Sequence, residues 1–425
     1  MGVRFVFQRL AARFSGPWRN VGWVALAEMY VIFIFWVVLS RGLFEYVGAD
    51  FLALRASGQI AQSVGFAEVY DLSAQQQWQR PVYDAYAVGP GRMPYATVPL
   101  PYLPPFIALV QPLSLLEPVA GFGLWTLFNA AVFVLYLRRF ANKVGIHRLT
   151  RLTATMCLAL PFVTTLLFGQ VNVWLLVFLG EFVLSAHGGG KFRAGLWLAC
   201  LLLKPQTLII FIPGLLLARQ FTVLAGFALG ALSLLAASVS LAGVAGLTDL
   251  VRLLVQYSGG IATNFPESMM NWRALALRLA PILPSSVAWG LGALGMVGTM
   301  AVALWLWVSR GATSPPRIGM LMLGTYAATG AISWHSHIHM ALPTVVPLVY
   351  LVAAGRLPYS AITLWTVLPA VTFLAVVFPL GEGAAHDLAG AVYLLINLWL
   401  LGVAARAMSR PLPTEPAASP PPLDG

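Results

Sequence analysis

Charged residues are scarce in this chain. Asp, Glu, Lys and Arg together make up 9% of the 425 residues, whereas about 25% is usual in globular proteins. So few charges cannot cover the surface of water-soluble domains, so the composition excludes an ordinary soluble protein of this length. Hydrophobic residues make up 59%, enough for roughly a dozen membrane helices at about 20 apolar residues each. The sequence predicts an all-α polytopic membrane protein.

Motifs for nucleotide and zinc chemistry are also missing. The chain has no Walker A loop, no Rossmann glycine fingerprint and no His-Glu-x-x-His motif. The lack of a nucleotide domain argues against ATP-driven transport and against a cytosolic nucleotide-sugar enzyme. We therefore expect a substrate that is reached from the outer leaflet. The two cysteines, Cys157 and Cys200, lie within apolar runs, which argues against a disulfide scaffold.

The charges that are present are mostly basic, with a net charge of +11. In a soluble domain this excess would suggest nucleic acid as a partner. In a membrane protein, basic residues instead mark the cytoplasmic ends of helices, so we expect no nucleic-acid partner. Arg4, Arg9, Arg13 and Arg19 precede an apolar stretch at 21–40. That stretch is too long for the core of a cleaved signal, so we expect an uncleaved first helix.

The apolar runs and the positive-inside rule predict about twelve spans with both termini in the cytoplasm. The first helix, about 21–40, runs outward to a first outer loop at 41–99 that carries interfacial helices. A proline-broken piece at 100–116 is expected to be re-entrant or interfacial. The helix at about 119–137 then returns to the densest basic cluster, at 138–151.

Further apolar runs continue this path to residue 405, with a second outer loop at 244–281. The runs on either side of Lys204 are too short for straight helices to cross roughly 30 Å of hydrocarbon at about 1.5 Å per residue. Two broken helices that meet partway through the bilayer are therefore expected. We expect one membrane domain over 1–410 and a disordered, proline-rich cytoplasmic tail over 411–425. The runs after the basic cluster lie at about 152–168, 171–187, 194–203, 206–218, 221–243, 282–309, 318–332, 339–354, 359–379 and 388–405.

Two ionisable residues stand out. Asp50 follows the first helix by about ten residues, near the outer headgroup level, where a carboxylate can serve as a general base if burial tunes its pKa. The alternative is a helix cap or a solvated loop acid. Lys204 lies within an apolar run, at a cost of roughly 2.5–3.5 kcal/mol for insertion. It either snorkels to the interface or forms an anion site with the free N–H groups of the helix after Pro205, and phosphate is the obvious anion.

Other polar residues gather on the same predicted side. Gln170 and Asn172, at a second helix break, either bind sugar hydroxyls or belong to an ordinary glycine turn. The three histidines of Ser333-Trp334-His335-Ser336-His337-Ile338-His339 alternate, a spacing that can ligate a metal. Because no cysteine is near, we favour hydrogen bonds to a phosphate or an acceptor over zinc. Arg273 and Arg55 are further cations on this side that can hold a phosphate.

Five motifs occur in order along the chain and together resemble glycosyltransferase family 87, the membrane mannosyltransferases and arabinofuranosyltransferases with the GT-C fold. The likeness extends from about residue 20 to 405, and the segment after Ser333-Trp334 fits it as well. The motifs are Ala49-Asp50-Phe51, Val69-Tyr70-Asp71, Tyr102-Leu103-Pro104-Pro105-Phe106, Phe168-Gly169-Gln170-Val171-Asn172 and Leu203-Lys204-Pro205.

The resemblance implies transfer of a sugar, mannose first, from a polyprenyl-phosphate donor to an acceptor hydroxyl on a lipid or glycan at the outer face of the cell membrane. It implies a metal-independent inverting displacement without cofactors, and Asp50 matches the family's proposed general base. We assign the donor phosphate to Lys204 and Arg273 with a histidine. The family pattern Ser-Trp-x-His-His departs from Ser-Trp-His-Ser-His here, which leaves the choice between His335 and His337 open. The proposed substrate-binding residues are Arg55, Tyr70, Gln170, Asn172 and His339.

Two other functions compete with this interpretation. A transporter or lipid-linked-sugar flippase also uses helices that break at mid-depth. An inverted repeat would favour it, but we find none, and the polar residues crowd one face of the membrane instead of the midplane. A structural or assembly subunit without catalysis leaves the one-sided cluster of acid, cations and histidines unexplained.

Overall fold

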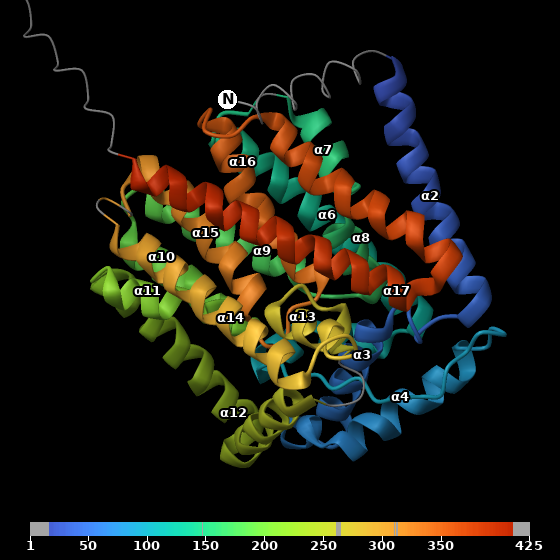
Figure 1. Cartoon of the computed structure of the whole chain (residues 1–425). Helices are drawn as coiled ribbons and strands as arrows, with labels where there is room; N and C mark the ends of the chain where they lie inside the picture. Colours follow the sequence, from blue (N-terminus) through green and yellow to red (C-terminus); the bar gives the residue numbers. More distant parts are fainter. Residues whose placement is uncertain (1–16, 147, 261–264, 310, 312, 411–425) are drawn as a thin grey trace, which may run out of the picture.

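The computed structural model describes residues 17–146, 148–260, 265–309, 311 and 313–410. Within these ranges the regular secondary structure is entirely helical, which confirms the predicted all-α class (Figure 1). The basic residues before position 17 and the predicted tail at 411–425 lie outside the described residues.

Among the described residues, five helices are long and apolar enough to cross a membrane. The bent pair of α7 (Leu149–Cys157) and α8 (Leu160–Phe168), which turns by 58°, makes a sixth if it is counted as one span. This confirms several membrane spans, but the described residues do not show the twelve that we expected, because many apolar runs form helices too short to count. The five are α2 (Pro17–Arg41), α6 (Pro118–Lys143), α12 (Phe221–Gly260), α14 (Ser285–Val308) and α17 (Tyr359–Ser409).

Single glycines divide the two longest helices. Gly243 in α12 has φ 66° and Gly381 in α17 has φ 84°, a left-handed conformation that glycine adopts without steric cost. Figure 1 shows the chain changing direction between the orange and red arms of α17. The separate runs predicted at 359–379 and 388–405 therefore correspond to the two arms of one kinked element.

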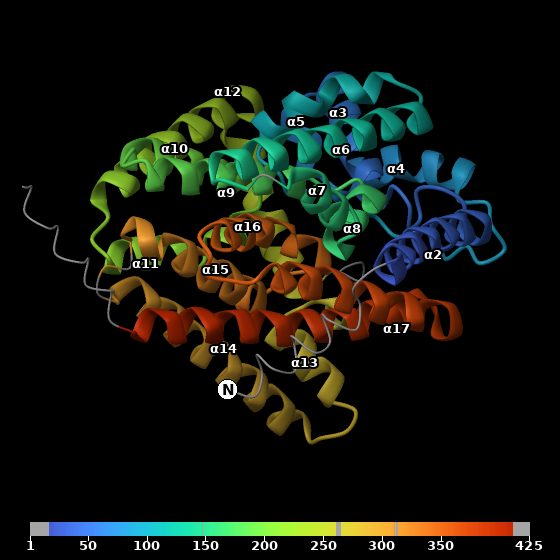
Figure 2. The same cartoon turned by 90° about the horizontal axis from the view of Figure 1, so that it is seen from above.

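The first outer loop is a folded helical unit. It contains α3 (Ala49–Ser63), η1 (Phe66–Tyr70) and α4 (Leu72–Tyr86), which lie together at one end of the molecule (Figures 1 and 2). The side chain of Gln79 donates to the Val98 carbonyl at 2.8 Å and accepts from the Val98 N–H at 3.0 Å. A buried glutamine of α4 thus holds the chain that leads to the proline-broken piece, α5 (Pro104–Val110) and η2 (Gln111–Leu115).

The segment predicted as a second outer loop also contains helices. Most of 244–281 is helical, because α12 continues beyond Gly243 and is followed by η6 (Pro266–Ser268) and α13 (Trp272–Leu279). Residues 261–264 lie outside the description. The other elements are α9 (Asn172–His187), α10 (Lys191–Ala199), η3 (Cys200–Leu203), η4 (Pro205–Leu208), α11 (Phe211–Leu217), α15 (Pro315–Ile332), η7 (Ile338–Thr344) and α16 (Val345–Ala353).

Several helix ends converge on one region. The backbone N–H of Gly48, which precedes α3, donates to the Leu167 carbonyl near the end of α8 at 2.7 Å. Both α8 and α9 contact η7. The chain breaks at 42–48, 169–171 and 333–337 therefore lie close together, and backbone that leaves a helix here brings its side chains to one place.

Candidate active site

Asp50 is the second residue of α3, and the residues before it fix its position. Gly48 at the N-cap has φ 84°, so the chain enters the helix through a turn that favours glycine. The hydrogen bond from Gly48 to Leu167 anchors this entry to α8. Asp50 is thereby brought to the turn between α8 and α9. A carboxylate in the first turn also complements the helix dipole, although the N-cap of α3 is Gly48, with no side-chain cap hydrogen bond.

The turn between α8 and α9 must contain a glycine. Gly169 has φ 77°, and a Cβ atom there would lie 2.5 Å from the Cβ of Phe51. Its carbonyl accepts from Trp125 Nε1 at 2.8 Å. The close approach to α3 explains the glycine of the Phe168-Gly169-Gln170-Val171-Asn172 motif, and it places Gln170 beside Asp50.

Gln170 links the predicted acid to the predicted cation. Its Oε1 accepts from Lys204 Nζ at 2.6 Å and from the Tyr102 hydroxyl at 3.4 Å. Because its carbonyl oxygen faces these donors, its amide N–H is left for Asp50, with which the Gln170 side chain also forms a hydrogen bond. Lys204 Nζ donates in addition to Asn172 Oδ1 at 3.2 Å. We refer to Asp50, Tyr102, Gln170, Asn172 and Lys204 as the amide network.

Gln170 and Asn172 were predicted to bind sugar hydroxyls, and in the structure both contact Lys204. Their side-chain carbonyls hold the buried ammonium group of Lys204. Lys204 itself lies between η3 and η4 with φ −136° and ψ 86°, since a residue before proline avoids the helical region. The break that we expected next to Lys204 is therefore present, and the lysine points into protein and not toward open solvent.

Asp50 is accessible in part, yet its surroundings are those of a buried group. Burial raises the pKa of Asp50 above its ordinary value, while the hydrogen bond from Gln170 and the charge of Lys204 act in the opposite direction. The pKa shift has the sign of burial, so desolvation outweighs both polar neighbours. Asp50 and Lys204 form no direct ion pair among the described residues. A carboxylate with a raised pKa is a better proton acceptor than a solvated one.

The three predicted histidines form a row beside this network. The rings of His335 and His337 are 4.8 Å apart, and those of His337 and His339 are 5.7 Å apart. The charge of Lys204 acts on both His335 and His339. Nowhere in the described ranges do three His, Cys, Asp or Glu side chains gather as metal ligands. His339 contacts Phe168 instead, with their rings 6.1 Å apart.

Arg273 lies near His335, at the start of the histidine row. The backbone N–H of Met270 donates to the Ser336 carbonyl, and Asn271 Nδ2 donates to the Ser333 carbonyl, each at 2.8 Å. These bonds hold the start of α13 against the Ser-Trp-His segment. The guanidinium of Arg273 stacks over the ring of Trp334 at 4.3 Å, and its charge acts on His335.

Several buried polar atoms in this second region have no hydrogen-bond partner within the part of the chain that the structure describes. They are Nε and Nη1 of Arg273, Nδ1 of His335 and Oγ of Ser336. An unpaired buried polar group costs about 1–3 kcal/mol, so a group of them is typical of a binding site. We refer to Arg273, Trp334, His335 and Ser336 as the arginine–histidine cluster.

Two predicted residues do not join these groups. Arg55 donates to Gln59 Oε1 at 2.8 Å and to the Leu116 carbonyl at 3.2 Å. It lies five residues after Asp50, roughly 140° around the helix. Tyr70 is buried, and its hydroxyl donates to the carbonyl of Tyr102 at 2.7 Å. Tyr70 therefore binds the backbone of Tyr102, a member of the amide network.

Sequence reasoning missed other residues of the site. Tyr257 hydrogen-bonds His335 at 3.1 Å, and the charge of Asp50 acts on it. His386 of α17 bonds the Tyr46 hydroxyl, and its ring lies 5.9 Å from Phe168. A lone histidine near two acids inside the apolar run of α17 was the available signal for His386. A tyrosine at the end of a long apolar run gave none for Tyr257.

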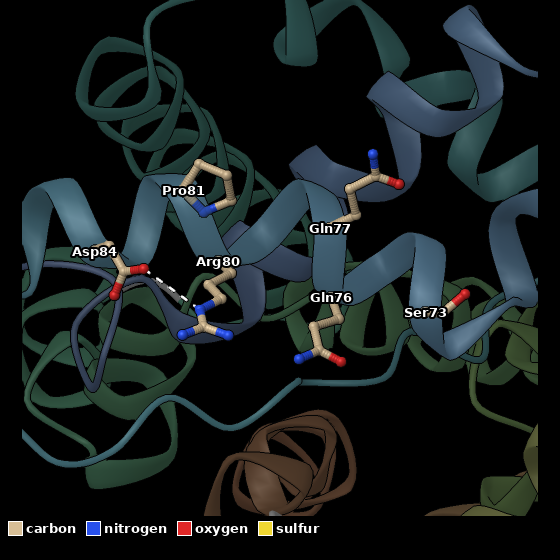
Figure 3. Close-up of a pocket in the computed structure, with 6 residues that line it drawn as sticks. All are labelled: Ser73, Gln76, Gln77, Arg80, Pro81 and Asp84. Atoms are coloured by element: carbon tan, nitrogen blue, oxygen red, sulfur yellow. Dashed lines mark ion pairs between the residues drawn. The ribbon is translucent and has the colours of Figure 1, made fainter.

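A surface groove of about 530 Å³ lies elsewhere, along the exposed face of α4 (Figure 3). An ion pair between Arg80 and Asp84, at 3.5 Å, is drawn there. No residue that we predicted for the site lines this groove. Its lining residues are Ser73, Gln76, Gln77, Arg80, Pro81 and Asp84.

Comparison with protein families gives one decisive result. The model of glycosyltransferase family 87 matches residues 101–330, which is more than half of the chain. The chain belongs to glycosyltransferase family 87. Membership makes it a glycosyltransferase with a sugar donor and an acceptor, and its long apolar helices make it a multi-pass membrane protein. The matched range includes Gln170, Lys204 and Arg273, whereas Asp50 and the histidines lie outside it. No curated protein matches the chain.

Proposed function

We propose that this glycosyltransferase takes mannose from a polyprenyl-phosphate carrier and transfers it to an acceptor hydroxyl on a lipid or glycan at the outer face of the cell membrane. One observation carries the proposal. A carboxylate and a buried ammonium group, Asp50 and Lys204, meet at the two ends of one amide side chain. The neighbouring arginine–histidine cluster offers buried donors that no protein acceptor occupies in the described residues.

The proposed reaction is an inverting displacement. Asp50 removes the proton from the acceptor hydroxyl, whose oxygen forms a bond to the anomeric carbon of the sugar. The bond from that carbon to the phosphate oxygen breaks, and polyprenyl phosphate leaves with one more negative charge than it had in the donor. Lys204, Arg273 and His335 stabilise this developing charge. Because these residues supply the required positive charge and donors, we propose a metal-independent reaction without a cofactor.

The other predicted residues take supporting roles in this proposal. His337 and His339 border the donor phosphate or the sugar, since they continue the row that begins at His335. Gln170 and Asn172 act on the substrate through Lys204, whose ammonium they hold.

We further propose one GT-C-type membrane domain over 1–410 with about twelve spans and both termini in the cytoplasm. The kink at Gly381 supports this larger number of crossings, because it separates the two apolar runs predicted at 359–379 and 388–405. The dense basic segment at 138–151 supports the orientation.

The direct test incubates purified protein in sealed lipid vesicles with polyprenyl-phosphomannose and a lipid acceptor. The proposal predicts polyprenyl phosphate and mannosylated acceptor in equal amounts. A flippase moves the intact donor across a sealed vesicle and releases no polyprenyl phosphate. Movement of the donor without its cleavage would therefore replace the proposed function with the flippase.

A further inference from the structure

The connection between α2 and α3 is docked on the kink of α17. Arg41, the last residue of α2, donates from Nη2 to Oε2 of Glu382 at 2.8 Å. Glu382 directly follows Gly381, the residue at the kink. One turn further along the same face of α17, His386 forms a hydrogen bond with the Tyr46 hydroxyl. Two contacts therefore tie this connection to the second arm of α17, where the end of α2 lies beside the kink (Figures 1 and 2).

The guanidinium of Arg41 joins two carboxylates. Its Nη1 donates to Glu45 Oε1 at 2.8 Å, and Glu45 Oε2 accepts from the Tyr83 hydroxyl at 3.2 Å and from the Met93 N–H at 2.9 Å. Both glutamate side chains are mostly buried. Among the described residues Arg41 is the hydrogen-bond partner of Glu382, whose buried Oε1 has none. The forked guanidinium can hold both acids at once, which a lysine cannot do with the same geometry.

Packed rings connect the docked segment to the histidine row. The ring of Phe168 lies 5.0 Å from that of Tyr46, 5.9 Å from that of His386 and 6.1 Å from that of His339. Tyr46 precedes Asp50 by four residues, and His339 belongs to the histidine row. The place of this connection on α17 therefore affects the acid and the histidine row together.

The spacing of these two groups matters for a displacement. The acceptor oxygen must reach the anomeric carbon opposite the phosphate, and a misplacement of about 1 Å can lower a rate by about a hundredfold. We propose that Arg41 and Glu382 are positioning residues that dock the connection between α2 and α3 on α17 and thereby hold Asp50 at a fixed distance from the arginine–histidine cluster. This inference rests on the proposed function, because its effect on the rate needs Asp50 as the base.

The kinetic test is a double-mutant cycle on the full chain with Arg41→Met, Glu382→Leu and the double variant. Each single change should lower kcat by about tenfold to a hundredfold. KM for the donor should stay unchanged, because the arginine–histidine cluster remains intact. The double variant should lose no more than the worse single variant, since one contact is lost only once and no buried charge is left unpaired. Glu382→Gln keeps an acceptor oxygen for Arg41 and should retain more kcat than Glu382→Leu.

Hydrogen exchange measures the docking itself. The N–H groups of Phe44 and Gly48 donate to the carbonyls of Val47 and Leu167, each at 2.7 Å. If the connection is released from α17, these hydrogen bonds open more often. Exchange of the backbone amides at 43–48 should therefore be faster in Glu382→Leu than in the wild type, and this measurement needs no substrate.

Arg139→Met is the matched control. It removes another ion pair between helices, that of Arg139 in α6 with Glu181 in α9, and should change neither kcat nor the exchange at 43–48. Unchanged kcat or unchanged exchange in Glu382→Leu, or losses that multiply in the double variant, would overturn the inference. Faster exchange in a protein without transfer activity would refute the proposed function and not the docking.

Discussion

The two polar regions of the candidate site differ in how their hydrogen-bonding capacity is used. In the amide network, Gln170 accepts from Lys204 and Tyr102 and donates to Asp50, so both ends of its amide have a partner within the protein. In the arginine–histidine cluster, buried N–H groups have no acceptor among the described residues. The difference indicates that the amide network is rigid before substrate binds. The arginine–histidine cluster instead has donors available for an anionic ligand.

This contrast assigns the two partners of a displacement to different regions. A general base must be held in place and must keep a suitable pKa, which a closed hydrogen-bond network provides. A leaving group brings its own charge, and donors that are already oriented stabilise it without reorganisation. The cost of leaving those donors unpaired in the free protein is offset when the anion binds.

The largest effect is expected from a variant of Asp50, the acid of the amide network. Asp50→Asn should lower transfer by about 10²–10⁴-fold, the range for a general base, in the assay of released polyprenyl phosphate. Folding raises the pKa of Asp50, so the folded state binds protons more tightly than the unfolded chain, and ionisation at neutral pH destabilises the fold. The melting temperature of Asp50→Asn at pH 7 should therefore be no lower than that of the wild type. Near-normal transfer would remove Asp50 from the mechanism.

A second variant addresses the open region. Arg273→Gln removes one fixed cation from the arginine–histidine cluster and should lower kcat by about 10²–10³-fold, as loss of an oxyanion donor does. The loss should be smaller in kcat/KM for an acceptor than for the phosphate donor, because only the donor carries the charge. Equal activity of wild type and Arg273→Gln would show that the leaving phosphate binds elsewhere.

A pair of variants separates the role of Gln170 from that of Asn172. Both amides hold Lys204, but only Gln170 lies between it and Asp50. Gln170→Leu allows a direct ion pair of Asp50 with Lys204, which lowers the pKa of a carboxylate. The acid limb of kcat/KM against pH should then move to lower pH and the maximum rate should fall about tenfold, since a weaker base accepts a proton less readily.

Asn172→Leu is the control for this pair. It loosens Lys204 without opening a path to Asp50, so its acid limb should stay where that of the wild type lies, above the ordinary pKa range of an aspartate. Gln170 and Lys204 act on Asp50 in the structure, and the charge of Asp50 acts on Tyr102 and Tyr257. Acid limbs that coincide in the two variants would contradict the role of Gln170 as a spacer.

The smallest effect is expected outside both regions. Arg55 bonds Gln59 and the Leu116 carbonyl on the side of α3 away from Asp50. Arg55→Gln should change transfer by less than about twofold and stability by about 1 kcal/mol or less, which is typical of a partly exposed contact. A drop comparable to that of Arg273→Gln would return Arg55 to the substrate site.

Local signals in the sequence were sufficient for part of the site. A lysine next to a proline, a glycine between amides and an acid just after a first span each disturb an apolar pattern, so Lys204, Gly169 and Asp50 were predictable. The helical content of the chain followed from composition in the same way. These features depend on short stretches of sequence and on the exclusion of water.

The other features of the site depended on contacts between segments that lie far apart in the sequence. Whether Gln170 meets a sugar or Lys204 is decided by the close packing of Gly169 on Phe51, which no run of residues reveals. The sequence also does not reveal that Arg55 lies on the side of α3 away from Asp50. The expected twelve spans rested on counting apolar runs, while several of those runs fold as short helices joined at sharp bends.

The most direct measurement is a cryo-EM structure of the full chain in nanodiscs with a bound non-hydrolysable analogue of polyprenyl-phosphomannose. The account predicts the phosphate within hydrogen-bonding distance of Arg273 and of His335 Nδ1. It also predicts that the anomeric carbon lies between this phosphate and the carboxylate of Asp50, with Gln170 still bonded to Lys204. A phosphate bound away from the arginine–histidine cluster, with Asp50 on the same side of the sugar as the phosphate, would contradict it.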